Sequence, residues 1–287
     1  MIRNTLSDDE RSEIWTGDNL DRQRSGLDII EYLLGRYERR GPDKDSLVMN
    51  INGEWGAGKS FTLAKLCAEL KKRGFPVVFF DAWANDYSDQ PLMAFAAALD
   101  NDLQPFMPKS EAIKEAVGRV GEKAMILAKN VAQTYIDQQL QKYLGTNSTD
   151  LKELLSNGET PAEISKIAED FLLQHGARKT LIELFHQDMS RLVTAIEKER
   201  PNGLPIFVVI DELDRCRPNF AVEFLEAIKH VLQVEGVYFL VATDAAQLAE
   251  SIKAIYGLNF DGRGYLKRFF EVEYRLPDPN YANFAKF

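Results

Sequence analysis

The stretch of the chain that decides its fold is Gly53-Glu54-Trp55-Gly56-Ala57-Gly58-Lys59-Ser60. Its glycines allow the backbone to curl so that successive N–H groups point into one concavity, and a helix beginning directly after it adds its positive end. Such a concavity suits a phosphate group. The Lys59 ammonium is expected to lie on the β and γ phosphates of a nucleotide, and the Ser60 hydroxyl to bind Mg²⁺. All eight residues, and Phe61 after them, are candidate nucleotide contacts.

Apolar runs and helical patterns surround this loop. Leu47–Ile51 leads into it as a short strand, and Phe61–Lys72 has the leucine spacing of one helix face. A further helix is expected over Gly26–Arg40. Four more stretches fit strands, the last less clearly: Pro76–Phe80, Ile206–Ile210, Val237–Ala242 and Phe269–Leu276. Uniformly apolar strands separated by helices indicate an α/β fold with a parallel sheet covered on both faces.

The region between the second and third strands is much longer than one crossover requires. It has helical patterns over Glu111–Tyr143 and Pro161–Arg200, with a break at 145–148. We therefore divide the chain into a first half with the glycine loop (1–100), a helical insertion (101–200) and a second half (201–287). Because the chain ends on an aromatic, amphipathic stretch, Tyr281–Phe287, we expect further domain sequence to follow it.

A second chemical constellation is Phe207-Val208-Val209-Ile210-Asp211-Glu212, a strand that ends in two carboxylates. Ligands of parallel α/β sheets bind at this carboxyl edge. Asp211 is the candidate to hold Mg²⁺ through water, and Glu212 to orient and deprotonate an attacking water. An acidic turn after a core strand is common by itself, but here it accompanies the glycine loop. A phosphotransfer kinase excludes water, so Glu212 favours hydrolysis over a kinase.

Composition and missing motifs narrow the class of protein. No Asn-Lys-x-Asp motif occurs, which disfavours GTP, and no Leu-Ser-Gly-Gly-Gln, which argues against a transporter cassette. The net charge of -9 disfavours broad attraction to nucleic acid or anionic membrane, although a local basic patch stays compatible with it. Cys67 and Cys216 are far apart in sequence, which indicates neither a disulfide framework nor a zinc site and favours a cytoplasmic setting.

Two further groups have both a functional and a structural interpretation. Thr243 follows the fourth strand, where its hydroxyl contacts the γ phosphate or the attacking water, or else caps a helix over Asp244–Ile255. Arg263, Lys267 and Arg268 lie on a helix expected before the last strand. They are either a solvated face or the source of a charge-stabilising arginine, acting in cis or across a subunit, for which Arg268 is the candidate.

Residues beside the two constellations are expected to play supporting roles. Asp81 ends the second strand as a loop-capping carboxylate or, alternatively, lies behind the metal site, and Trp83 is expected in the core. Arg215 and Arg217 follow the carboxylates, and each is assigned either a salt bridge with Asp214 or a phosphate on a neighbouring subunit.

Four strings together resemble the KAP family of P-loop NTPases, which are additional-strand ATPases related to the AAA+ and STAND classes. They are the glycine loop (Walker A), Phe-Phe-Asp-Ala-Trp at 79–83, Asp-Glu-Leu-Asp-Arg-Cys at 211–216 (Walker B) and Tyr-Leu-Lys-Arg-Phe-Phe at 265–270 with Leu-Pro at 276–277. The resemblance implies a three-layer P-loop fold with sheet order 5-1-4-3-2, ATP as nucleotide and a role as a molecular switch. It also implies that Leu20-Asp21-Arg22 lies near the adenine.

The chain departs from many members of this family in its insertion. Those members have a transmembrane hairpin there, whereas this insertion contains five charged residues within one helix length, Glu115, Arg119, Glu122, Lys123 and Lys129. Because such charge is costly in lipid, we expect no membrane span and a surface for a protein partner or another copy of the chain. Bacterial members of this family are often associated with phage exclusion and defence, so the resemblance implies a setting in phage defence.

Two functions stay open at this point. The first is a slow ATPase that works as a switch, and the second is a nucleotide-dependent oligomerisation or signalling module with negligible turnover. A kinase acting on a small substrate is a remote third.

Overall fold

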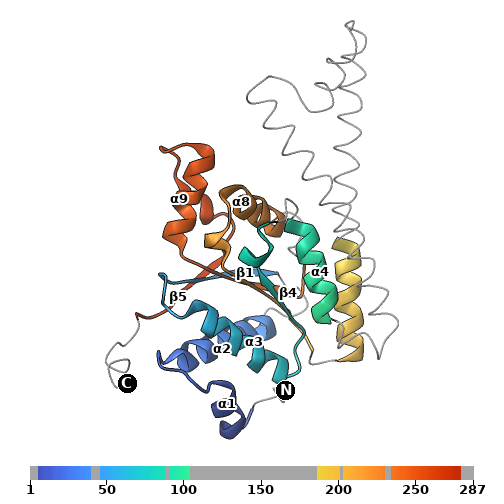
Figure 1. Cartoon of the computed structure of the whole chain (residues 1–287). Coiled ribbons are helices and arrows are strands. Elements are labelled where there is room, and N and C mark those ends of the chain that lie inside the picture. Colours follow the sequence, from blue (N-terminus) through green and yellow to red (C-terminus); the bar gives the residue numbers. More distant parts are fainter. Residues whose placement is uncertain are drawn as a thin grey trace, which may run out of the picture.

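The computed structural model describes residues 6–39, 46–87, 91–103, 186–200, 203–229 and 234–278. A five-stranded sheet lies at the centre, with helices on both faces (Figure 1). Its strands are β1 (Leu47–Asn52), β2 (Val77–Asp81), β3 (Ile206–Asp211), β4 (Val237–Thr243) and β5 (Val272–Arg275). All neighbouring strands are parallel, in the order β2-β3-β4-β1-β5. Read from the other edge this is the expected order 5-1-4-3-2, so the three-layer prediction is confirmed.

Strands β1 to β4 are mainly apolar because both faces of the sheet are covered, whereas β5 at the edge is partly exposed. On β4, for example, Val237, Phe239 and Val241 belong to one buried cluster, and the alternate residues Tyr238, Leu240 and Ala242 to the other. One face packs against α2 (Arg22–Arg39) and α3 (Lys59–Lys72). The opposite face packs against α4 (Pro91–Leu103), residues 186–199, α8 (Pro218–Ala227), α9 (Ala245–Tyr256) and α10 (Gly262–Leu266). The two layers lie below and above the sheet in Figure 1.

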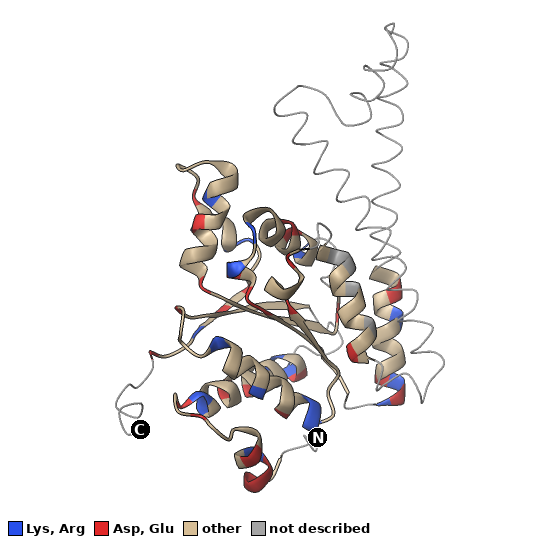
Figure 2. Cartoon of the chain, in the orientation of Figure 1, with Lys and Arg blue, Asp and Glu red and all other residues tan. Residues whose placement is uncertain are grey.

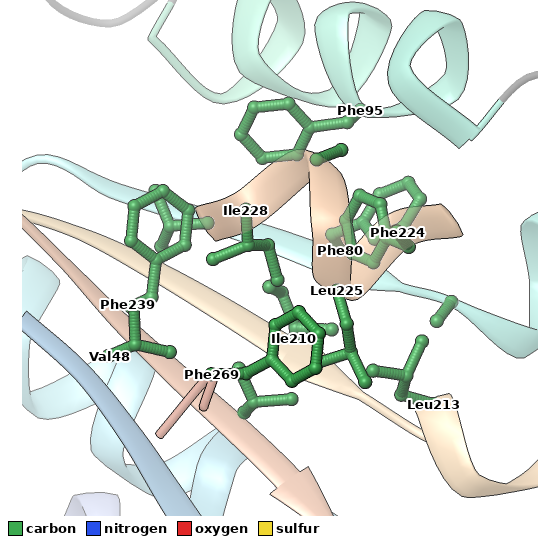
Figure 3. Close-up of a cluster of buried hydrophobic side chains, with 14 of the residues drawn as sticks. Val48, Phe80, Phe95, Ile210, Leu213, Phe224, Leu225, Ile228, Phe239 and Phe269 are labelled. Carbon is green, nitrogen blue, oxygen red and sulfur yellow. The ribbon is translucent and has the colours of Figure 1, made fainter. Parts of the chain in front are cut away.

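Aromatic rings form the centre of the upper layer (Figure 3). Phe224 of α8 lies with its ring centroid 4.9 Å from that of Phe80 and 6.2 Å from that of Phe95 of α4. All three side chains are almost completely buried. These contacts join α4 and α8 to the end of β2, and so fix the frame around the carboxyl edge of the sheet.

We expect Phe224→Ala to lower the free energy of unfolding by about 3–5 kcal/mol, because the change removes a buried ring and leaves a cavity. Denaturant unfolding followed by circular dichroism measures this loss as a lower midpoint at unchanged slope. Leu258→Ala is the matched control, since Leu258 is 88% exposed. Equal midpoints for both variants would contradict the assigned packing.

Several element boundaries differ from the sequence prediction. Helix α2 begins at Arg22 and α3 at Lys59, both earlier than expected, while β5 is shorter and leaves Phe269 in the turn before it. Helix α1 (Asp8–Ile14) was not predicted. It has few apolar residues, and it begins at a reciprocal Ser7–Glu10 capping box, in which each side chain accepts from the other's backbone N–H.

Only the ends of the expected insertion fall within the described residues. Helix α4 continues to Leu103, and residues 186–199 are helical as predicted, with Leu192 and Ile196 buried against the upper layer. The predicted helix over Glu111–Tyr143, most of that over Pro161–Arg200, and the five charged residues named above lie outside the described residues. The division of the chain at 101–200 therefore stays a prediction. Of the helices that the structure describes, none is long and apolar enough to cross a membrane.

Candidate functional site

The glycine loop joins β1 to α3, as its sequence predicts. Gly56 and Gly58 have φ values of +82° and +79°, a left-handed conformation that favours glycine. The N–H of Gly53 donates to the carbonyl of Thr243 at 3.1 Å, and the N–H of Ala57 donates to the carbonyl of Glu54 at 3.1 Å. The loop therefore curls back on itself at the carboxyl edge of the sheet and delivers the chain into the first turn of α3.

Lys59 lies across this loop. Its ammonium donates to the carbonyl of Gly53 at 2.7 Å and to that of Glu54 at 3.3 Å. It also lies 3.9 Å from a carboxylate oxygen of Asp214, and both of these side chains are 11% exposed. The loop's own carbonyls thus hold the positive charge of Lys59 over the loop, and its contact with the β and γ phosphates stays a prediction.

Ser60 and Asp211 lie close together, Ser60 in the first turn of α3 and Asp211 at the end of β3. Asp211 is 4% exposed and also accepts the N–H of Glu212 at 2.9 Å. Burial raises the pKa of Asp211; the neighbouring Ser60 hydroxyl and the N–H of Glu212 oppose this, and the negative charges of Asp81 and Asp214 add to it. A hydroxyl and a carboxylate side by side among further acids form an oxygen donor set that fits Mg²⁺.

Glu212 stands next to this pair on a strained backbone. Its φ of +60° places a residue with a side chain in the left-handed region, which costs free energy and occurs often at functional sites. Its carboxylate lies 3.0 Å from the guanidinium of Arg215. Burial raises the pKa of Glu212, Arg215 opposes this, and Asp211 adds to it. The side chain of Glu212 is therefore paired with Arg215, while Asp211 beside it is buried.

Three polar residues tie the site together: Asp214, which the sequence offered only as a salt-bridge partner for the following arginines, and Asn50 and Asn52, which had no role assigned from sequence. Asp214 accepts the N–H of Asp244 at 3.0 Å and so joins the end of β3 to the start of α9. Asn50 and Asn52 of β1 accept, respectively, the Thr243 hydroxyl at 2.9 Å and the N–H of Ala245 at 3.1 Å. The available signals were two polar residues inside an apolar strand and the position of Asp214 in the second motif.

Thr243 is completely buried at the end of β4, directly beside Asn52 in the sheet register. The alternative role as a helix cap is wrong for this residue, because the cap of α9 is Asp244, whose carboxylate accepts from the N–H groups of Ala246 and Gln247. The contact of Thr243 with a γ phosphate or water stays a prediction.

Asp81 caps its loop, as the structural alternative expected, by accepting the N–H of Ala84 at 2.8 Å. The prediction that Trp83 lies in the core is wrong, because this residue is 53% exposed. Strand β2 ends at Asp81, so Trp83 lies beyond the carboxyl end of the strand. The guanidinium of Arg215 lies 5.5 Å from the centroid of the Trp83 ring.

The two arginines after the carboxylates pair with acids other than Asp214, and their contact with a phosphate on a neighbouring subunit stays a prediction. Arg215 pairs with Glu212 at 3.0 Å, and Arg217 with Asp86 at 3.1 Å. Neither of these two ion pairs involves Asp214, whose ionic neighbour is Lys59. The two arginines therefore bind the acids of neighbouring turns, and Arg215 covers the candidate base.

The basic residues before β5 lie on and just after α10, and all three, Arg263, Lys267 and Arg268, are exposed. The Arg268 guanidinium lies 5.4 Å from the ring centroid of Tyr265, and its carbonyl accepts from Lys229. Among the described contacts of Arg268, none is with the glycine loop or with Asp211 and Glu212. Basic and acidic segments are interspersed over the helices in the view of Figure 2.

Comparison with known proteins bears on the whole arrangement. A family model described as the KAP family P-loop domain matches residues 36–287, which include the glycine loop, the Asp211–Glu212 turn and β5. No curated protein matches the chain. The family match covers most of the sequence and agrees with the observed sheet order. The chain therefore belongs to the KAP family of P-loop NTPases.

Proposed function

We propose that this protein binds Mg-ATP and hydrolyses it slowly, and that it acts as a switch. The observation that carries the proposal is the position of Glu212, directly after the buried Asp211 and on the same sheet edge as the loop that holds Lys59. A carboxylate beside the metal ligand, but not part of it, is what water activation needs. The direct test compares phosphate release by the native chain and by Glu212→Gln, as described in the Discussion.

The residues divide the chemistry among themselves. The loop from Gly53 to Ser60 receives the phosphates through those of its N–H groups that are not bonded to backbone carbonyls, together with Phe61 and the Lys59 ammonium. Ser60 and Asp211 would hold Mg²⁺, which supplies charge neutralisation when bound. Glu212 orients a water for in-line attack on the γ phosphorus and takes its proton. The bond from the γ phosphorus to the bridging oxygen breaks, and the electron pair leaves with ADP.

Two further residues are proposed to respond to the γ phosphate. Thr243 is held by Asn50 at the centre of the sheet edge, and a phosphate contact requires its hydroxyl to exchange that partner. Arg268 is exposed on the α10 side, from which it stabilises charge in cis or at the site of a second subunit. The net negative charge disfavours nucleic acid as a partner, and the proposed partner is a protein or another copy of the chain, bound through the insertion.

A second candidate function is a nucleotide-dependent oligomerisation or signalling module with negligible turnover. The ion pair between Arg215 and Glu212 favours it, because a carboxylate held by a guanidinium is a weaker base. Stoichiometric ADP in the purified protein with no measurable turnover supports this function. Rapid exchange and steady phosphate release count against it.

We expect Arg215→Ala to raise kcat up to about fivefold at unchanged KM, because it releases Glu212 from a partly exposed ion pair worth at most about 1 kcal/mol. Steady-state phosphate release measures the change. Arg217→Ala is the control, since its ion pair is with Asp86. A tenfold fall in kcat for Arg215→Ala would instead assign the guanidinium to the phosphates.

We propose that the protein acts in the cytoplasm in defence against phages. The proposal is based on the resemblance of the chain to bacterial KAP proteins. Plating of phages on a host that expresses the native chain or Lys59→Ala tests this role. Equal plating on both hosts, for every phage tried, would remove the defence assignment and leave the ATPase assignment intact.

A further inference from the structure

Residues Trp15–Arg22, called here the N-terminal brace, precede the matched family domain, which begins at residue 36, yet they pack against the phosphate loop. The contact is made by Arg22, the first residue of α2, which is only 1% exposed. Its Nε donates to the carbonyl of Ala57 at 2.9 Å. A segment outside the family match therefore reaches the part of the loop that the nucleotide is expected to contact.

The bond to Ala57 fixes the direction of one peptide group. Because the C=O and the following N–H of a trans peptide point in opposite directions, a carbonyl of Ala57 held by Arg22 turns the N–H of Gly58 the other way. That N–H belongs to the set expected to line the phosphate concavity. Without the guanidinium, this peptide is free to rotate, since glycine at 58 offers little resistance.

The brace also closes the space behind Gly58. A Cβ atom placed on this residue would lie 2.9 Å from Cδ1 of Leu20 and 3.4 Å from Nε of Arg22. The side chains of Leu20 and Arg22 thus fill the space outside the loop at Gly58. Gly58 packs against them with a φ of +79°. The loop is supported from behind at the position where its backbone is least restricted.

The turn that presents Arg22 is held by three hydrogen bonds to one side chain. The two carboxylate oxygens of Asp18 accept the N–H groups of Leu20 at 3.2 Å, Arg22 at 2.9 Å and Gln23 at 2.7 Å. Between them, Asp21 has a φ of +57°, a left-handed conformation for a residue with a side chain. Such a backbone costs about 1–3 kcal/mol and persists only where its surroundings hold it.

The other end of the brace is anchored to α3. Trp15 is 3% exposed, its indole N–H donates to Glu69 at 2.8 Å, and its ring meets that of Phe61 edge to face at 6.4 Å. Gly26 lets the indole lie against α2, because a Cβ there would be 2.2 Å from the ring. The brace thus touches α3 both at its first turn and near its end.

One feature of Arg22 points beyond packing. Its Nη2 atom is buried and has no hydrogen-bond partner among the described residues. An unpaired buried donor costs about 1–3 kcal/mol, and an apolar side chain would fill this space without that cost. Filling the space is therefore not enough to explain why an arginine occupies this position.

We propose that Arg22 is a positioning residue, which holds the Ala57–Gly58 peptide so that the phosphate loop is ready for nucleotide. Docking of the brace and binding of nucleotide are then coupled, and each strengthens the other. The proposal rests on nucleotide binding by the loop, but it also makes a claim about the loop itself that can be measured without nucleotide.

The first experiment is calorimetric titration of the full chain with Mg-ADP. Arg22→Met keeps the length of the side chain but removes its donors, and we expect it to raise Kd about tenfold or more. Arg22→Lys restores one donor and returns Kd to within about threefold of the native value. Arg24→Met, an exposed arginine on the same helix, leaves Kd unchanged. Native affinity in Arg22→Met would overturn the proposal.

The second experiment is amide hydrogen exchange without nucleotide, which separates the brace from the proposed function. We expect Arg22→Met to speed exchange in the loop residues 56–60 while the amides of β3 and β4 keep their native rates. Uniformly faster exchange across the sheet would show that Arg22 only stabilises the fold. Unchanged exchange in the loop would show that Arg22 does not hold the loop. A native chain that fails to bind Mg-ADP refutes nucleotide binding, while the exchange result still decides the role of Arg22.

Discussion

Lys59→Ala is expected to weaken Mg-ATP binding by about a hundredfold or more. The ammonium lies over the loop within 2.7 Å of the Gly53 carbonyl, and each hydrogen bond from a charged donor to phosphate contributes about 1.5–3 kcal/mol. Two such bonds account for the expected factor. Calorimetric titration at fixed magnesium measures it, and hydrolysis at low ATP falls in the same proportion or further.

The control for this change is Lys71→Ala, on the exposed side of the same helix. Both variants are first compared by thermal unfolding, because the loss of Lys59 also frees two loop carbonyls. Binding of Mg-ATP by Lys59→Ala within threefold of the native chain would contradict the assignment of the glycine loop as the phosphate site.

Glu212→Gln is expected to lower kcat by about a hundred- to a ten-thousandfold while Mg-ATP affinity stays within a few-fold of native. Glutamine keeps the size of the side chain and a hydrogen-bond acceptor for Arg215, but it cannot take a proton from water. The separation of kcat from affinity identifies a group that acts in the chemical step. Steady-state phosphate release and titration of the same preparation measure the two quantities.

Glu250→Gln serves as the matched control, since its side chain is 66% exposed on α9. If the Glu212 variant hydrolyses ATP at the native rate, another group activates the water and the role given to Glu212 is wrong. If the native chain itself binds nucleotide without turnover, the interaction module becomes the better account.

The strands and the phosphate loop could be predicted because local sequence determines them. Strands β1 to β4 are mainly apolar on both faces, and Gly56 and Gly58 lie where the backbone needs left-handed conformations. The order of the strands was implied by family resemblance rather than by any pattern of residues. Periodicity carries no information on which strands become neighbours.

The polar connections of the site could not be predicted, because they join residues far apart in the chain. Asn50 meets Thr243 across 193 positions, and Arg22 meets Ala57 across 35. Trp83 was expected in the core because it is a large aromatic residue. It follows the carboxyl end of β2 instead, where it is exposed beside Arg215. Helix α1 lacks the apolar periodicity that marks a helix, although its Ser7-x-x-Glu10 cap was visible.

The most direct test of the account is a single-turnover experiment with the native chain in excess over γ-phosphate-labelled ATP and magnesium. The account predicts that all label appears as inorganic phosphate in one exponential phase, with ADP formed in equal amount. Label that stays in ATP throughout, or that passes to another molecule, would contradict the claim that this protein is an ATP hydrolase.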